Sequence, residues 1–163
     1  MKLTASALLL LALAPAASAA APEPKLDMTG FFTGKTHADN VIKIALHSPH
    51  KLIVDSIGGR NKEGEFILID NLQEEGKPAR KRTWAMHPVG PDRFTGSLSD
   101  AVGPVDVLVS GNTATIRYTM RDGNMKIEQR LALQPNGTLS NEVIARKFGL
   151  KFATVQGTIR KAD

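Results

Sequence analysis

The sequence has no cysteine, which excludes disulfide bonds, thiol catalysis, zinc–thiolate sites and a lipid-modified N-terminal cysteine. Aromatic residues are scarce, at 5% of the chain, so a core must consist mainly of Ile, Leu, Val and Met. Hydrophobic residues nevertheless make up 42% and charged residues 23% of the 163 residues, which is typical of a folded chain and not of a disordered one. The length suits one domain.

The first nineteen residues have the pattern of an export signal. Lys2 supplies a positive charge, and Ala5–Ala14 is an apolar run about half as long as a membrane-spanning helix needs, which argues against a membrane anchor. Ala17 and Ala19 give the small-x-small spacing that signal peptidase cleaves, so we expect the mature chain to begin near Ala20. We therefore expect a protein exported to a bacterial periplasm, and not lipid-anchored because the required cysteine is missing.

After the signal, residues 1–19, we expect a flexible Pro-containing lead over residues 20–28 and a single domain over residues 29–163. Without the signal the chain keeps 20 basic and 16 acidic residues, a net charge of +4. The basic residues are scattered apart from 80–82, so nucleic acid is not an expected partner. The mild positive charge is compatible with a peripheral contact to the headgroups of an anionic membrane.

Short β-prone segments, separated by turn residues, follow one another at intervals of about 8–12 residues. Several turns contain Asp-Gly, Gly-Asn or Pro-Asn-Gly, which favour tight hairpins because these residues accept positive φ. The clearest turns are 58–61, 75–78, 90–92, 111–112, 122–123 and 135–137. The pattern predicts about nine or ten antiparallel strands and no helix longer than a turn or two.

Successive hairpins can be tested against one another, because each turn fixes a register. The Gly-Asn turn places Val105 opposite Tyr118, and the Asp-Gly turn places Tyr118 opposite Ile127. The Pro-Asn-Gly turn continues with Leu133 opposite Leu139. Four consecutive strands thus agree on which face is apolar.

So many strands exceed what one open twisted sheet holds comfortably, and closure removes the edges. We therefore expect an all-β fold, an antiparallel up-and-down barrel of about eight to ten strands, with a β-sandwich as the alternative. A barrel of this size encloses either packed side chains or one small ligand.

The most informative hairpins, within residues 66–100, place charged side chains on the apolar face. One turn sets Asp70 opposite Arg82, and the next sets Arg82 opposite Asp100. Arg82 is thus expected between two carboxylates, on the face that carries Trp84, the only Trp. A buried guanidinium needs such partners, because an unpaired buried charge is strongly destabilising and the planar fork suits two acceptors.

This cluster has two interpretations. Asp70, Arg82 and Asp100 form a structural ion network at a barrel end, or Arg82 anchors an anionic head group such as a fatty-acid carboxylate. For the second interpretation, the candidate ligand-binding residues share the predicted inner face: Arg82, Trp84, Met86, Tyr118 and Gln129.

No residue pattern supports catalysis, a metal or a cofactor. His47 and His50 lie in one turn but lack the helical spacing of a metalloprotease motif. Neither a nucleophile elbow nor a phosphate-binding glycine loop occurs. Asp70 and Asp100 are poor candidates for an acid–base pair, because a guanidinium between them keeps both ionised.

Several short motifs occur in order along the chain: Phe31–Lys35 (FFTGK), Arg82–Trp84 (RTW), Gly90–Gly96 (GPDRFTG), Asp100–Pro104 (DAVGP) and Lys147–Gly149 (KFG). Together they resemble the family called domain of unknown function 3833, envelope proteins of Gram-negative bacteria that are often predicted to be lipoproteins. The resemblance covers about residues 26–161 and implies a lipocalin-like barrel and an envelope location. It supplies no activity, and this chain departs from the family in lacking the lipobox cysteine.

The leading hypothesis is a non-enzymatic periplasmic protein that binds an apolar or amphipathic small molecule, such as a lipid or fatty acyl compound, inside the barrel. The first alternative is a structural or interaction module of the envelope whose barrel is filled by side chains. The second is an enzyme acting on lipids or isoprenoids, with Asp70 or His87 transferring protons. A hollow interior would separate the leading hypothesis from the filled module.

Overall fold

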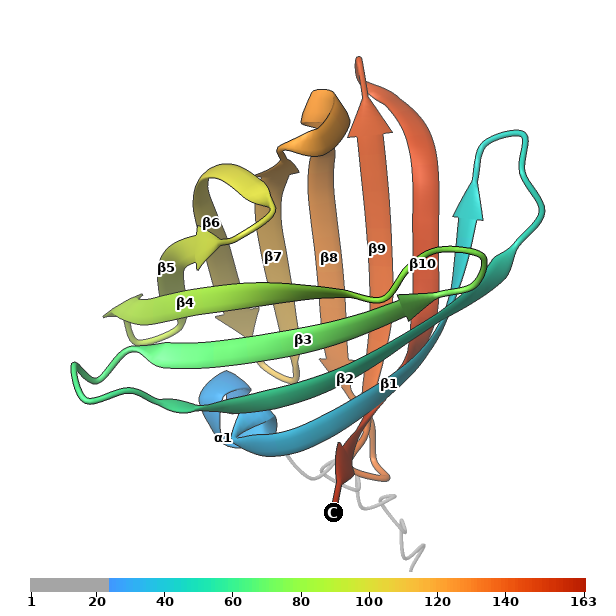
Figure 1. Ribbon diagram of the computed structural model, residues 1–163. Coiled ribbons are helices and arrows are strands. Elements are labelled where there is room, and N and C mark those ends of the chain that lie inside the picture. The colour runs from blue at the N-terminus through green and yellow to red at the C-terminus, as the bar shows by residue number, and fades with distance from the viewer. Residues whose placement is uncertain (1–23) are drawn as a thin grey trace, which may run out of the picture.

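In the computed structural model, which describes residues 24–163, ten antiparallel strands close into a barrel (Figure 1). The strands are β1 (Gly34–Ile44), β2 (His50–Arg60), β3 (Phe66–Glu74), β4 (Arg80–Gly90), β5 (Arg93–Leu98), β6 (Ala101–Ser110), β7 (Thr113–Met120), β8 (Lys126–Leu133), β9 (Leu139–Lys147) and β10 (Leu150–Ala162). A short helix, α1 (Met28–Phe32), precedes β1, and a 3-10 turn, η1 (Asp122–Asn124), joins β7 to β8.

Each strand pairs with its neighbour in sequence, and β1 pairs with β10 to close the ring. The predicted up-and-down barrel is therefore confirmed, and the alternative β-sandwich is wrong. The expected export signal, residues 1–19, lies outside the described residues. Neither α1 nor η1, the helical segments of residues 24–163, has the length and apolarity to span a membrane.

The turn dipeptides set most of the hairpin registers correctly. The predicted pairings are confirmed in the hairpins β3–β4, β7–β8 and β8–β9. In β6–β7 the prediction is wrong for Val105, which does not pair with Tyr118, because the register of β6 against β7 shifts between Val102 and Asp106. A Gly-Pro pair lies at this shift, and proline cannot donate to the ladder. On its other side, toward β5, Val105 pairs with Gly96.

The core lies inside the barrel, because alternate residues of each strand point inward. Aliphatic side chains dominate it, as the composition required, and the largest fully buried ones are Leu72, Leu131, Leu139, Val105 and Val107. Trp84 and Tyr118 add an edge-to-face aromatic pair, with ring centroids 5.5 Å apart. Most of the barrel is therefore packed, and one cavity inside it is described below.

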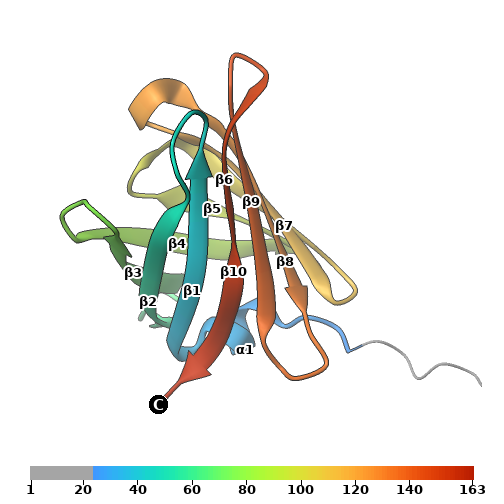
Figure 2. The same cartoon turned by 90° about the vertical axis from the view of Figure 1, so that its right-hand side faces the viewer.

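Helix α1 covers one end of the barrel, opposite the end that carries the β9–β10 turn (Figures 1 and 2). The Asp27 carboxylate caps it by accepting a hydrogen bond from a first-turn N–H at 2.9 Å. Met28 and Phe32 bury its inner face, and Leu26 just before it is 3% exposed. The expectation of a flexible lead over residues 20–28 is therefore wrong for its last residues, because the apolar side chains of 26 and 28 pack against the core.

Two histidines make ion pairs along the strands of the barrel wall. Nδ1 of His37 lies 2.6 Å from Oδ1 of Asp55, and Nε2 of His50 lies 2.8 Å from Oε1 of Glu74. The hydrogen bond to Asp55 raises the pKa of His37, against a smaller opposing effect of burial. The hydrogen bond to Glu74 likewise raises the pKa of His50.

We expect the free energy of unfolding to fall as pH rises from about 6 to about 8. Below the unfolded-state pKa of about 6.5 the contribution of both imidazolium ions is fully present, and it is lost as pH passes through their raised folded-state pKa values. Urea unfolding at a series of pH values measures this. In the double variant His37→Gln/His50→Gln, the free energy of unfolding should fall much less over this pH interval. In His47→Gln it should fall as much as in the wild type. A wild-type stability that rises across this interval would contradict the assignment.

Candidate ligand-binding site

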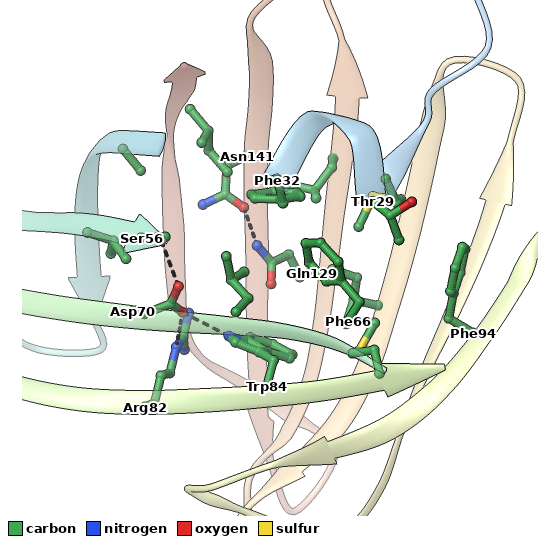
Figure 3. Close-up of a pocket in the computed structure, with 18 of the residues that line it drawn as sticks. Thr29, Phe32, Ser56, Phe66, Asp70, Arg82, Trp84, Phe94, Gln129 and Asn141 are labelled. Carbon is green, nitrogen blue, oxygen red and sulfur yellow. Dashed lines mark hydrogen bonds and ion pairs between the residues drawn. The ribbon is translucent and has the colours of Figure 1, made fainter. Parts of the chain in front are cut away.

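The carboxylate of Asp70 is the centre of a buried polar cluster on β2, β3 and β4 (Figure 3). Its Oδ2 accepts hydrogen bonds from Nε of Arg82 at 2.7 Å and from Nε1 of Trp84 at 2.8 Å. Its Oδ1 accepts one from Oγ of Ser56 at 2.7 Å. Because Ser56 and Arg82 are the residues directly opposite Asp70 on the two flanking strands, the ladder itself positions these donors.

The electrostatics of this cluster favour the charged form of Arg82. Burial, the largest single effect, lowers the pKa of Arg82, but the charge of Asp70, the effects of Tyr118 and Asp100 and the hydrogen bond to Asp70 together outweigh it, so the net direction is upward. The guanidinium carbon also lies 5.0 Å from the ring centroid of Trp84, a cation–π contact. Burial raises the pKa of Tyr118, which keeps that hydroxyl neutral.

Asp100 does not complete the predicted bridge around Arg82. Its Oδ2 accepts a hydrogen bond from Nη1 of Arg80 at 2.9 Å, and no hydrogen bond joins it to Arg82 among residues 24–163. The reason is local: β5 ends at Leu98, and the chain turns before Asp100 can continue the ladder opposite Arg82. Asp70 and Arg82 thus form the predicted pair, whereas Asp100 acts on Arg82 through its charge alone, which contributes to the raised pKa of the guanidinium.

A chain of side-chain amides forms a second polar group, on β8, β9 and β1. Gln129 donates from Nε2 to Oδ1 of Asn141 at 2.8 Å, and Asn141 donates from Nδ2 to Oδ1 of Asn40 at 2.9 Å. Asn40 and Asn141 belong to strands on either side of β10, where both pair with Gly157. A Cβ at Gly157 would collide with Oδ1 of Asn40, so the missing side chain allows the two amides to meet.

A cavity of about 90 Å³ is lined by residues of both polar groups. Apart from these, the lining is mainly apolar and includes Phe66, Leu68, Met86, Phe94, Ile116 and Leu131. Met28, Thr29 and Phe32 of α1 complete it at the covered end (Figure 3). The barrel is therefore hollow over part of its length, although a cavity of this volume is smaller than the one of about 150 Å³ that holds benzene in a protein core.

Four of the five candidate ligand-binding residues lie in this lining: Arg82, Trp84, Met86 and Gln129. Tyr118 does not, because it packs edge-on against Trp84 outside the cavity. Sequence reasoning missed Ser56, Asn40 and Asn141, although the alternation that places their neighbours inside also applies to them. It also missed the contribution of α1, whose five residues are too few to give a helical period.

His47 and His50, at the β1–β2 turn, each contact an oxygen atom of the protein. His50 is engaged by Glu74, and Nδ1 of His47 lies 2.9 Å from the Ala45 carbonyl oxygen. Within residues 24–163, no group of three or more His, Asp or Glu side chains is arranged to hold an ion.

Solved structures share this fold at very low sequence identity. The S-type phycobiliprotein lyase from Guillardia theta matches with a TM-score of 0.64 and 6% identity, covering 80% of this chain and 88% of that one. The Rv2717c protein from M. tuberculosis matches with a TM-score of 0.57 and 10% identity, covering 81% and 93%. A DUF3598 protein of unknown function from Nostoc punctiforme matches with a TM-score of 0.58 and 10% identity, covering 86% and 51%. Identities this low show the fold alone.

Comparison with family models gives a match over residues 7–161 to the one described as a protein of unknown function, DUF3833. The match confirms the resemblance inferred from the short motifs. No curated protein matches the sequence.

The buried ion pair predicts unequal effects of two neighbouring arginines on stability. Arg82→Met leaves the buried Asp70 carboxylate without its counterion and should lower the free energy of unfolding by about 3–5 kcal/mol. Arg80→Met removes a half-exposed partner of Asp100 and should lower it by less than about 1 kcal/mol. Chemical denaturation of both variants measures the difference. Equal losses, or a loss below about 0.5 kcal/mol for Arg82→Met, would show that this ion pair is not buried.

Proposed function

The chain belongs to the DUF3833 family of proteins of unknown function, and we propose that its barrel binds an amphipathic small molecule of the lipid or fatty acyl class. One observation supports this most: a guanidinium whose side chain is only 16% exposed lines a cavity that side chains leave unfilled. The apolar lining suits an acyl chain, and the guanidinium suits a polar head.

The hydrogen-bonding inventory favours a head group that accepts hydrogen bonds. Asp70 already accepts from three donors, so it has little capacity for a donor on the ligand. Arg82 uses Nε in its bond to Asp70, and a guanidinium carries four further N–H donors on its two terminal nitrogens. A carbonyl or carboxyl oxygen of the ligand is the complementary group. Because Asp70 already neutralises Arg82, a charged carboxylate gains less from binding here than it would beside an unpaired arginine.

The volume of the cavity indicates that a complete acyl chain binds only when part of the lining moves. Met28 and Met86 are suited to this, since methionine is unbranched and repacks readily around different shapes. Helix α1 is the element best placed to yield, because it is only five residues long and among the strands makes its main contacts with β2. We therefore place ligand entry at the end covered by α1.

The other two hypotheses have less support. A filled structural module would leave no cavity between the two polar groups. For an enzyme, Asp70 is held by three donors, and His87 lies exposed on β4 outside the cavity lining. Neither residue has the geometry of a proton-transfer group toward the cavity.

Trp84 provides a direct test, because it is the only Trp, is 6% exposed and lines the cavity. We expect its fluorescence to change on titration with a medium-chain fatty acid or its methyl ester. Both should bind about tenfold or more tightly than the alkane of equal length, since a hydrogen bond to a charged group contributes about 1.5–3 kcal/mol.

Two variants, each with one alanine replaced by leucine, provide a matched test and control for that titration. Ala38→Leu adds bulk to the cavity wall and should weaken binding about tenfold or more, whereas Ala79→Leu, in the exposed β3–β4 turn, should not affect it. Equal affinities of these two variants would refute binding in the cavity. So would a Trp84 signal that no acyl compound changes.

We also propose that the protein acts in the periplasm after removal of residues 1–19, which is supported by the export pattern of that segment. Expression with the native N-terminus in a Gram-negative host should yield a periplasmic product whose mass begins near Ala20. Ala19→Asp should block cleavage, whereas Ser18→Asp, at the tolerant middle position, should not. A product that retains Met1 in the cytoplasm would contradict the proposal.

A further inference from the structure

Two turns protrude at the end of the barrel opposite α1, joined at their bases and apart at their tips (Figure 1). They are residues 45–49, between β1 and β2, and residues 148–149, between β9 and β10 (Figure 2). The N–H of Ala45 donates to the carbonyl oxygen of Phe152 at 2.8 Å, which joins their bases. We call Leu46, Phe148, Leu150 and Phe152 the tip surface.

The tip surface is the most exposed apolar part of the described chain. Leu46 is 104% exposed, Phe148 93% and Leu150 75%, whereas no other large hydrophobic residue among 24–163 exceeds 57%. Among the exposed large hydrophobic residues of 24–163, the two aromatic ones, Phe148 and Phe152, both belong to the tip surface. Clustered exposed apolar residues of this kind mark interaction sites, unlike single ones scattered over a surface.

The backbone at the tip surface is unfavourable for the residues that occupy it. Leu46 has φ 66° and Phe148 has φ 52°, in the left-handed region that favours glycine or asparagine. Bulky side chains are held in such conformations at a free-energy cost that the rest of the structure must offset. The two side chains extend into solvent, so packing within residues 24–163 does not offset it. This combination indicates that the side chains act on something outside the barrel.

Cationic side chains flank the β9–β10 turn of the tip surface. Lys147 lies with its Nζ 5.8 Å from the ring centroid of Phe148, and Arg146 pairs across the hairpin with Lys151. None of these three cations forms an ion pair with a carboxylate of residues 24–163. Acidic side chains also lie at this end: Asp122 is in η1, and at the base of the β1–β2 turn Glu74 bonds His50 and Glu75 accepts from the N–H of Lys51. The sequence Arg-Lys-Phe-Gly-Leu-Lys-Phe thus presents apolar and cationic groups together.

We propose that the tip surface docks the barrel onto an anionic phospholipid bilayer. Leu46 and Phe148 enter the boundary between headgroups and acyl chains, while Lys147 and Lys151 contact the phosphates. A bilayer fits better than a protein partner, because two separate protruding turns need a deformable surface and offer no concave or flat interface. The proposal does not depend on the cavity, which the tip residues do not line.

The test is co-sedimentation with vesicles, using the protein in the form its host produces. Vesicles of phosphatidylcholine mixed with phosphatidylglycerol are compared with vesicles of phosphatidylcholine alone. The double variant Leu46→Asn/Phe148→Asn removes the apolar side chains and installs a residue that tolerates positive φ. The control, Ile57→Thr/Leu108→Thr, alters two exposed apolar residues on the barrel wall. A charge variant, Lys147→Glu/Lys151→Glu, tests the phosphate contacts.

We expect the protein to bind the anionic vesicles about tenfold or more tightly than the neutral ones, and to be released in about 1 M salt, where the Debye length is about 3 Å. The asparagine and charge variants should each bind about tenfold or more weakly, and the wall control should bind as the wild type does. The asparagine variant should unfold at a temperature no lower than the wild type, and the Trp84 response to acyl ligands should be unchanged. The unfolding temperature shows whether a loss of vesicle binding comes from unfolding, and the Trp84 response shows whether it comes from a change in the cavity.

Three results would overturn the proposal. The first is a wild-type protein that does not bind anionic vesicles. The second is a tip variant that binds them as well as the wild type or the wall control. The third is a tip variant that loses a specific protein partner while vesicle binding is absent in all forms, which would make the tip surface a protein interface.

Discussion

Burial of the Asp70 carboxylate is the constraint on which the site depends. An ion in the barrel wall requires its counterion and a full set of donors, and here these come from Arg82, Trp84 and Ser56. A register slip of one residue on β3 would turn the carboxylate outward and leave the guanidinium inside without a partner. The ion pair therefore ties β2, β3 and β4 to a single register and orients the Trp84 ring along the cavity.

The cavity follows from the same arrangement. Polar side chains that are bonded to their own wall cannot pack into the centre, and this holds for the Asp70 cluster and for the amides of Gln129, Asn141 and Asn40. Ala38 and Ser56 are short and leave further volume beside them. An apolar space thus remains between two satisfied polar groups. This is the usual character of a small-molecule site, which combines a mainly apolar lining with a few placed polar atoms.

The sequence was sufficient for the barrel and for the pair of Asp70 and Arg82, because Gly, Asn, Asp and Pro turns fix hairpin registers and alternation then assigns faces. Extending a hairpin register beyond the end of its strand gave a wrong pairing for Asp100, which forms a hydrogen bond with Arg80 instead of Arg82. Alternation also predicts which face of the sheet a side chain occupies, but not whether that side chain reaches the cavity. Tyr118 is on the inner face, yet Trp84 separates it from the cavity, and the bond from the Trp84 indole to Asp70 depends on a rotamer that spacing does not encode.

The two ends of the barrel have different chemistry: α1 covers one, and exposed apolar and cationic groups mark the other. The central claim is that the space between them holds an amphipathic molecule. Native mass spectrometry of the protein purified from its own host, with analysis of an organic extract, tests it most directly. The account predicts an added mass that corresponds to an acyl compound and is absent from protein with a filled cavity. A protein that consistently carries no such mass, and takes none up from an extract of its own membranes, would contradict it.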